Sequence, residues 1–176
     1  MVVGIVDGDT VTILDHELHQ HKIRLAGIDA PEKPQPYGQK SKTSLARLLY
    51  KTTVRVDWNK RDRYGRIIGR ILVDSQDAGL VQIQEGLAWW YRAYAAEQPP
   101  KDRKVYEKVE AEARENRGGL WTDPVTHAPM GIPAPEADWT PRLTIHGHKK
   151  KFHPPFFRLS PVANLRHYSI TTKENP

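Results

Sequence analysis

The chain has 176 residues, no cysteine and a formal net charge of +6. This length suits one domain with an extension and is enough for one sizeable hydrophobic core. The sequence has no apolar run of about 18 residues, so no membrane-spanning helix is expected, and without cysteine there are no disulfides and no thiolate metal ligands.

The chain is predicted to begin with three strands in succession. Residues 2–6 and 10–14 are rich in β-branched residues and flank Asp7-Gly8-Asp9, in which Asp-Gly is a strong hairpin-turn signal. Residues 22–28 form the third strand, which gives an antiparallel meander. The N-terminus lacks the basic start, apolar run and cleavage site of a secretory signal, and the early first strand leaves open an upstream extension of the natural polypeptide.

Two carboxylates follow the third strand directly. Under the two-residue period of a strand, one face is expected to carry Ile23, Leu25 and Gly27, and the other Arg24, Ala26 and Ile28. Pro31 then stops regular pairing, so Asp29 and Glu32 are presented where the chain leaves the sheet. Carboxylates suit a hard cation and a guanidinium suits a phosphate, which suggests phosphodiester chemistry, with a plain surface ion pair as the alternative.

The remaining predicted elements mix helices and strands. Helices are predicted from residue 40 to Tyr50, over 79–85 and over 100–116, strands over 53–58 and 67–73, and an extended aromatic run over 88–94. The predicted fold class is therefore α+β. A five-stranded antiparallel sheet of this size can curl into a partly open β-barrel of the OB-fold type, here with three helices.

Prolines recur without helical or strand periodicity beyond Asp123. The chain is accordingly divided into a domain over residues 1–123 and a proline-rich, basic, irregular tail over residues 124–176. Residues 143–176 hold six lysines and arginines against one acid, so most of the net charge lies there. Such a segment suits an acidic partner such as nucleic acid, and a solvated, disordered tail is the alternative.

Asp9 begins the strand that neighbours the one leading to Asp29. Two acids at neighbouring strand ends can share one cation, and calcium would complete its roughly six to eight oxygen ligands with backbone carbonyls and water. A plain type I′ turn explains Asp7 and Gly8 equally well, but it does not require Asp9.

Two further segments combine bases with aromatics. Arg66 follows a Tyr-Gly turn, where a rigid guanidinium can bind a phosphate with two parallel hydrogen bonds, although a basic surface loop has the same composition. In the aromatic run, Trp89 or Trp90 is expected in the core. The other members are candidates for stacking on single-stranded bases, namely Tyr91, Arg92 and Tyr94.

Three motifs in this order resemble the staphylococcal nuclease-like (thermonuclease) family: Val6-Asp-Gly-Asp-Thr10, Arg24-Leu-Ala-Gly-Ile-Asp-Ala-Pro-Glu32 and Asp62-Arg-Tyr-Gly-Arg66. Shorter stretches that are also similar are Tyr37-Gly38, Gly86-Leu-Ala-Trp89 and Gly119-Leu-Trp121. The resemblance covers residues 2 to about 123. It implies an OB-fold barrel with three helices and calcium-dependent hydrolysis of DNA and RNA, and it offers no counterpart for the tail.

The resemblance also implies a role for each matched position. It implies calcium carboxylates at Asp9 and Asp29, a calcium-binding backbone carbonyl at Ala30, a carboxylate that orients or deprotonates water at Glu32, and phosphate clamps at Arg24 and Arg66. Nucleotide contacts are implied for Tyr64 and Tyr94. Arg92, beside Tyr91, occupies a further tyrosine position, which leaves base contacts there open. The loop between Glu32 and Tyr37 is shorter than in the type member, so how Glu32 is held is an open question.

The predicted function is a calcium-dependent endonuclease that hydrolyses phosphodiester bonds in DNA and RNA. Single strands are the expected preference, because contacts to phosphate, sugar and stacked bases carry no sequence information. The alternative is a non-catalytic nucleic-acid-binding module on the same fold, but a pure binder does not need Asp9, Asp29, Glu32, Arg24 and Arg66 together. A monomer is expected. Secretion or a periplasmic location is favoured, because weak calcium sites are typical of extracellular modules, although no signal peptide is visible.

Overall fold

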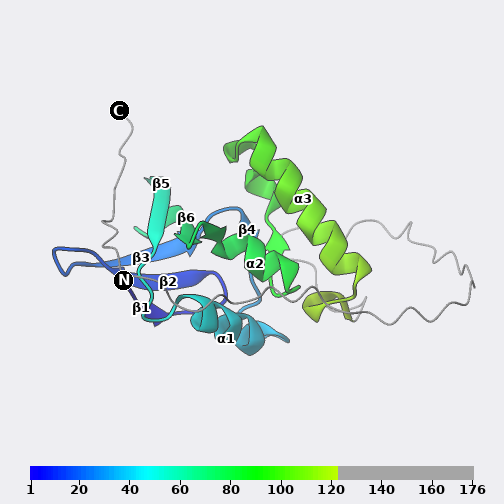
Figure 1. Cartoon of the computed structure of the whole chain (residues 1–176), viewed down its shortest axis with the longest axis horizontal. Helices are drawn as coiled ribbons and strands as arrows, with labels where there is room; N and C mark the ends of the chain where they lie inside the picture. The colour runs from blue at the N-terminus through cyan, green and yellow to red at the C-terminus, as the bar shows by residue number, and fades with distance from the viewer. Residues whose placement is uncertain (123–176) are drawn as a thin grey trace, which may run out of the picture.

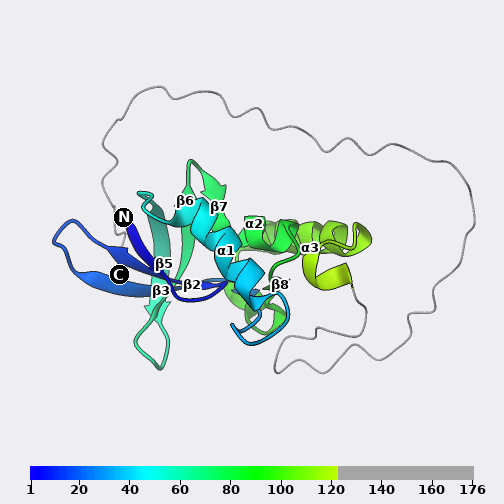
Figure 2. The same cartoon turned by 90° about the horizontal axis from the view of Figure 1, so that it is seen from below.

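The computed structural model describes residues 1–122, which form two β-sheets and several helices (Figure 1, Figure 2). The predicted tail over residues 124–176 lies outside the described residues. The strands are β1 (Val2–Ile5), β2 (Thr10–Leu14), β3 (Gln20–Leu25), β4 (Ile28–Asp29), β5 (Arg55–Arg61), β6 (Ile67–Val73), β7 (Gln76–Asp77) and β8 (Trp89–Trp90). The helices are α1 (Gly38–Leu49), α2 (Ala78–Gln84) and α3 (Pro100–Glu115), with 3₁₀ helices η1 (Arg92–Glu97) and η2 (Gly119–Thr122).

The larger sheet has the strand order β1-β2-β3-β6-β5, and β7 pairs with β6. The strands β1, β2 and β3 form the predicted antiparallel meander. β3 and β6, however, run parallel, with Arg24 opposite Ile68 and Leu25 opposite Gly69. The prediction of a wholly antiparallel sheet is therefore wrong, because the chain crosses over through α1 and β5 before β6 returns beside β3.

Five of the eight strands overlap the predicted ranges, and the other three have two residues each. One pair of these, β4 and β8, forms a separate small sheet. Within residues 1–122, β1 and β5 stand at the two ends of the pairing order, so strand hydrogen bonds do not close the larger sheet into a barrel. The α+β class is confirmed, whereas the described pairing is that of a mixed sheet rather than a five-stranded barrel.

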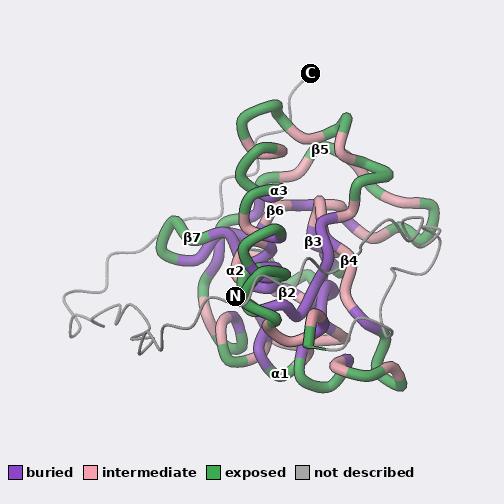
Figure 3. The backbone as a smooth tube through the Cα atoms, turned by 90° about the vertical axis from the view of Figure 1, so that its right-hand side faces the viewer, coloured by how far each residue is buried: buried purple, intermediate pink, exposed green. Residues whose placement is uncertain are grey.

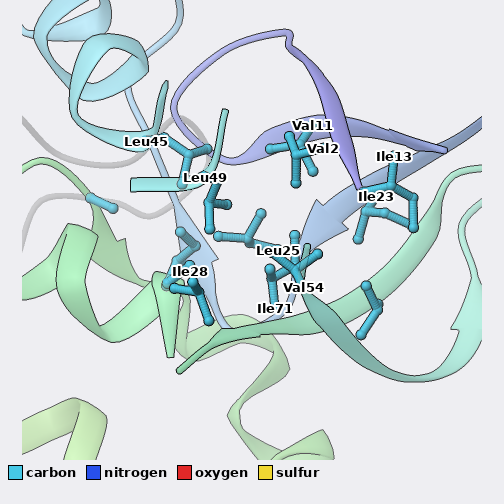
Figure 4. Close-up of a cluster of buried hydrophobic side chains, with 14 of the residues drawn as sticks. Val2, Val11, Ile13, Ile23, Leu25, Ile28, Leu45, Leu49, Val54 and Ile71 are labelled. Atoms are coloured by element: carbon cyan, nitrogen blue, oxygen red, sulfur yellow. The ribbon is translucent and has the colours of Figure 1, made fainter. Parts of the chain in front are cut away.

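The third strand ends earlier than predicted. Gly27 has φ +77°, a left-handed conformation that glycine adopts without steric cost, and β3 stops at Leu25. The chain resumes as β4 in the smaller sheet. This turn breaks the alternation of faces, so Ile28, which was predicted on the face of Arg24, is fully buried with Ile23 and Leu25 (Figure 4).

The hydrophobic core lies between the larger sheet and the helices packed on it. Buried positions gather in the strands and on one side of α1, and exposed positions lie mainly in the turns and along α3 (Figure 3). Leu45 and Leu49 of α1 are fully buried in this cluster (Figure 4). Tyr106 and Ala113 of α3 are buried as well. No helix within residues 1–122 is long and apolar enough to cross a lipid bilayer.

The aromatic run does not continue as the predicted extended segment. Trp89 and Trp90 form β8 and are both buried, while the following residues turn into η1. β4 offers only two residues for pairing, with Ile28 opposite Trp90 and Asp29 opposite Trp89. The extended segment therefore ends when its partner strand ends.

Candidate functional site

Arg24 joins the two carboxylates that the sequence predicts to share a cation. Its Nη2 atom lies 2.7 Å from Asp29 Oδ1 and 3.3 Å from Asp9 Oδ2. Its Nη1 atom donates a hydrogen bond to the Ile28 carbonyl at 3.1 Å. The register of β2 and β3 sets Thr10 opposite Arg24, which brings the preceding Asp9 alongside the guanidinium. Strand pairing and the turn before β4 thus assemble the three charges.

Several hydrogen bonds fix the position of Asp9. Its Oδ1 atom accepts a hydrogen bond from the Thr10 hydroxyl at 2.8 Å, and its Oδ2 atom accepts one from the Ala30 N–H at 3.3 Å. The Asp9 N–H donates to Asp7 Oδ1 at 3.1 Å. The sequence analysis did not place Thr10 or Asp7 at the site. The Asp-Gly-Asp-Thr motif, which contains both residues, was the feature that could have indicated them.

Burial dominates the electrostatics of both carboxylates. It raises the pKa of Asp9 to about 7, with the Arg24 guanidinium acting in the opposite direction. Burial also raises the pKa of Asp29, where Arg24 again opposes the shift and the nearby Glu32 charge adds to it. One guanidinium therefore does not fully replace the hydration that the two carboxylates have lost.

The donor set at this position fits a hard divalent cation. Asp9 and Asp29 supply carboxylate oxygens that converge on one positive charge, and the backbone carbonyl of Ala30 follows directly in the chain. Within residues 1–122 no group of three His, Cys, Asp or Glu side chains is arranged to bind a metal. A cation here would depend on two carboxylates, with backbone carbonyls and water completing its coordination.

Glu32 lies in a short loop that is fixed by its backbone. The Glu32 N–H donates to Gln35 Oε1 at 2.6 Å, and the Glu32 carbonyl accepts from the Gln35 N–H at 2.8 Å. Gly38 packs so closely that any side chain there would collide with the Glu32 carbonyl. The Glu32 carboxylate is exposed and has no hydrogen-bond or ion-pair partner among the described residues. The short loop therefore fixes the backbone of Glu32 and leaves its carboxylate available.

A cleft of about 800 Å³ opens beside Arg24. Its lining comes from the β5–β6 hairpin, from η1 and from the start of α3. The loop of this hairpin projects from the body of the molecule (Figure 2). Asp9, Asp29 and Glu32 are not part of its lining. The cleft does bring together five residues that the sequence predicts at the site, namely Arg24, Arg66, Tyr64, Tyr91 and Tyr94.

Arg66 is oriented by the turn that precedes β6. The Asp62 carboxylate accepts hydrogen bonds from the Arg66 N–H at 2.9 Å and from Arg66 Nε at 2.7 Å. The guanidinium carbon lies 5.5 Å from the centre of the Tyr64 ring. Within residues 1–122 the two Nη groups of Arg66 have no hydrogen-bond partner, so they are available for an anion.

Arg92 lies apart from this group. Its Nη2 atom is 2.6 Å from Oε2 of the buried Glu110, and its guanidinium carbon is 4.6 Å from the centre of the Trp90 ring. Glu110 Oε1 also accepts a hydrogen bond from the Trp90 N–H at 3.0 Å. Arg92 thus belongs to a network that holds β8, and nucleotide binding by this residue stays a prediction.

Sequence reasoning missed several residues of the cleft. The strand β5 runs three residues beyond its predicted end at Trp58, because Lys60 and Arg61 still pair with Ile68 and Ile67 of β6. The sequence signal for Lys60, Arg61 and Arg63 was the run of basic residues just before the Arg66 turn. The missed lining residues include Trp58, Lys60, Arg61, Arg63 and Arg70.

Comparisons with known proteins agree with the resemblance seen in the motifs. A family model described as "Staphylococcal nuclease homologue" matches residues 22–123. The chain is 39% identical over 137 residues to "Micrococcal nuclease" of Shigella flexneri, an alignment that covers 73% of this chain and 76% of that protein.

Two further relatives have similar identity. An "Uncharacterized endonuclease" of Haemophilus influenzae is 38% identical over 122 residues, which is 69% of this chain and 65% of that protein. "Protein ParB" of Escherichia coli is 35% identical over 132 residues, which is 70% of this chain and 72% of that protein. With a family model that matches more than half of its length and relatives of this identity, the chain belongs to the staphylococcal nuclease family.

Proposed function

We propose that this protein is a calcium-dependent endonuclease that hydrolyses phosphodiester bonds in DNA and RNA. The observation that carries the proposal is the position of Arg24, which bridges Asp9 and Asp29 and lines the same cleft as Arg66. The names of the relatives, micrococcal nuclease and endonuclease, agree with this reaction class.

Arg24 and Arg66 would act on the phosphate. A phosphodiester resists hydrolysis because its anionic oxygens repel a nucleophile, and preorganised positive groups stabilise this charge as it shifts in the transition state. A guanidinium can bind two phosphate oxygens at once. Asp62 fixes Arg66 through Nε, which leaves the Nη groups for this task.

Asp9, Asp29 and the Ala30 carbonyl would hold the calcium ion. When bound, calcium would supply Lewis-acid stabilisation of charge on the phosphate oxygens. Burial raises the pKa of both carboxylates, so both gain from a cation that favours their ionised forms. A set made wholly of oxygen donors favours calcium over softer metals.

Glu32 would orient the attacking water or accept its proton. Its carboxylate has no partner within residues 1–122, while hydrogen bonds to Gln35 fix its backbone. A carboxylate can act as a general base if a water lies within hydrogen-bond reach.

Single-stranded substrates are the proposed preference. Tyr64, Tyr91 and Tyr94 line the cleft beside the two arginines, and aromatic rings stack on any base that is not held in a duplex. Such contacts do not distinguish deoxyribose from ribose, which supports action on both DNA and RNA.

We also infer that the larger sheet is the OB-type barrel of the family in a partly open form. The order of its five longer strands, with β3 and β6 parallel, supports this assignment. Residues 1–123 would then form a monomeric catalytic domain, and residues 124–176 a basic extension that contacts nucleic acid.

The test is hydrolysis by the purified protein. Heat-denatured DNA and RNA should both be degraded when calcium is present, and a chelator should stop the reaction. An Arg66→Gln variant should lose about 10²–10³ in rate, the usual cost of one preorganised donor. If labelled oligonucleotides bind but stay intact with calcium, the protein is the non-catalytic binding module instead.

A further inference from the structure

We propose that Trp58 and Arg61 form a binding site for a nucleotide that flanks the scissile bond, with the base on Trp58 and a phosphate on Arg61. This flanking-nucleotide site rests on the proposed nuclease function and extends it, because it makes longer single strands better substrates. Neither residue belongs to the charged group around Arg24.

A bulge in β5 brings the two side chains together. In an unbroken strand, residues 58 and 61 lie on opposite faces, because side chains alternate. Here Trp58 pairs with Gly69, Lys60 with Ile68 and Arg61 with Ile67, so residue 59 is the extra residue of a bulge. Trp58 and Arg61 therefore share one face of β5.

Both residues line the cleft, and their side chains contact each other. The Arg61 guanidinium carbon lies 5.6 Å from the centre of the Trp58 ring. Both residues line the cleft that also contains Arg24 and Arg66. The bulge thus sets an aromatic ring and a cation at the wall of the cavity proposed to take the substrate.

Arg61 retains an uncompensated charge. Its guanidinium donates to the Gly65 carbonyl at 3.0 Å and has no carboxylate within ion-pair distance among residues 1–122. Two neighbouring bases in the cleft are neutralised, since Lys60 lies 2.5 Å from Glu97 and Arg70 lies 2.8 Å from Asp77. A guanidinium with unused donors and no counter-ion is suited to a phosphate.

Trp58 offers a fixed surface for stacking. The side chain is half-buried and packs against the hydrophobic core, which limits its motion. Stacking on a fixed ring contributes to the binding of any base, so the site is tolerant of sequence. The Arg61 cation above the same ring adds the backbone contact that single-strand binding sites combine with stacking.

The size of the cleft leaves room for more than the reacting phosphate. Its volume of about 800 Å³ lies in the upper part of the range for small-molecule sites, roughly 300–1,000 Å³. Its lining extends from Arg24 to Tyr106 of α3. Arg24 shares a sheet face with Ile68 and Lys60, whereas Trp58 and Arg61 share the other face. Because β5 ends the strand order, a strand bound at Arg24 and Arg66 can reach the flanking-nucleotide site over the edge of the sheet.

The test compares two substrates of different length. Hydrolysis of a thymidine dinucleotide and of a thymidine hexanucleotide is measured with Arg61→Gln, with Trp58→Leu and with the control Arg55→Gln. Arg55 is an exposed arginine on the same strand outside the cleft. For the first two variants, the loss in kcat/KM on the hexanucleotide should exceed the loss on the dinucleotide by roughly tenfold, within the range of one stacking contact. The control should show no such difference.

Binding measured with a chelator separates this site from the reaction. The labelled hexanucleotide should bind the full-length protein more tightly than the dinucleotide, and Arg61→Gln should remove most of this difference. If no substrate is cleaved but this binding pattern is found, the nuclease proposal fails and the site stands. If cleavage occurs but both variants lose equally on both lengths, the site is refuted and the nuclease stands. Should Trp58→Leu fail to fold by circular dichroism, Arg61→Gln decides.

Discussion

At the scale of single residues, Arg24 links structure to chemistry. It is the counter-charge of Asp9 and Asp29 and it also lines the cleft, so a phosphate that binds there competes with the carboxylates for the same donors. A cation held by Asp9 and Asp29 would relieve this competition. The proposed calcium site and the phosphate site are therefore expected to bind cooperatively.

Replacing Asp9 by asparagine should stabilise the calcium-free protein at alkaline pH. The pKa of Asp9 is raised to about 7 by burial, so the folded protein binds its proton more tightly than the unfolded chain does. The bound proton therefore stabilises the folded state. This stabilisation is complete below the ordinary pKa of aspartate near 4 and is lost as the pH rises through 7. Asparagine keeps the shape without the charge.

We expect Asp9→Asn to exceed wild type in free energy of unfolding by about 1–3 kcal/mol at pH 8, with the difference shrinking towards pH 5. Urea denaturation with a chelator measures this. Asp57→Asn, which changes an exposed carboxyl on β5, is the control and should have little effect. A difference that is constant across this pH range would contradict the cause given for the shift.

Replacing Glu32 by glutamine should lower turnover far more than binding. The carboxylate has no partner among residues 1–122, so its loss breaks no structural contact, and the backbone bonds to Gln35 are kept. Its expected role is that of a base, which contributes typically about 10²–10⁴ in rate. The kcat on denatured DNA and the affinity for a labelled oligonucleotide are measured together.

Glu115→Gln is the matched control for the charge change, because Glu115 is exposed on α3 away from the cleft. If Glu32→Gln weakens binding as much as turnover, Glu32 has a structural role instead.

At the scale of elements, the site depends on contacts between segments that are distant in sequence. The signals that sequence reasoning could use are local: an Asp-Gly turn, helical spacing, a proline after a strand. They predict α1, α2, α3 and the meander. The bulge at residue 59 and the parallel pairing of β3 with β6 have no local signal. Each depends on which strand pairs with which, and tertiary contacts determine this pairing.

Arg92 illustrates the same limit at the site. Arg92 lies in an aromatic segment, which favours stacking on bases. Its guanidinium nevertheless binds Glu110, which is 18 residues away in the sequence. A buried carboxylate needs a counter-ion, and this requirement outweighs the local pattern. Arg24, by contrast, lies within five residues of Asp29, so its pairing was visible in the sequence.

A buried glutamine on α2 is predicted to fix the turn that carries Asp9. Gln82 is fully buried, and its Nε2 atom lies 2.7 Å from the Gly8 carbonyl, 3.1 Å from the Ser41 carbonyl and 3.0 Å from Ser41 Oγ. Gln82→Leu would leave the Gly8 carbonyl without its donor. We expect a loss of about 1–2 kcal/mol in free energy of unfolding and faster hydrogen exchange at Asp9 and Thr10.

Gln84→Leu on the same helix is the control for the change in hydrophobicity, because Gln84 is exposed. Thermal unfolding and native-state hydrogen exchange measure both variants. Equal effects of the two substitutions would mean that the hydrogen bonds of Gln82 do not hold the turn.

At the scale of the whole molecule, charge is distributed unevenly along the chain. Residues 143–176 carry six of the 27 lysines and arginines but one of the 21 acids, whereas the rest of the chain is close to neutral. The acids near the cleft, such as Asp62, Glu97 and Asp102, neutralise several of its bases. The long-range attraction for a polyanion is therefore expected to come mainly from the C-terminal segment.

Deleting residues 143–176 should weaken oligonucleotide binding most strongly at low salt. Bases that contact phosphates release counterions, and each contact on a single strand steepens the dependence of log K on log salt by about 0.7. We expect the deletion to make this slope shallower by at least about one such contact. Replacing Lys149, Lys150 and Lys151 by glutamine in the full-length chain should shift the slope in the same direction, which separates charge from length. Fluorescence anisotropy with a chelator, over about 50–200 mM salt, measures both variants. An unchanged slope in the deletion variant would show that the segment does not contact the substrate.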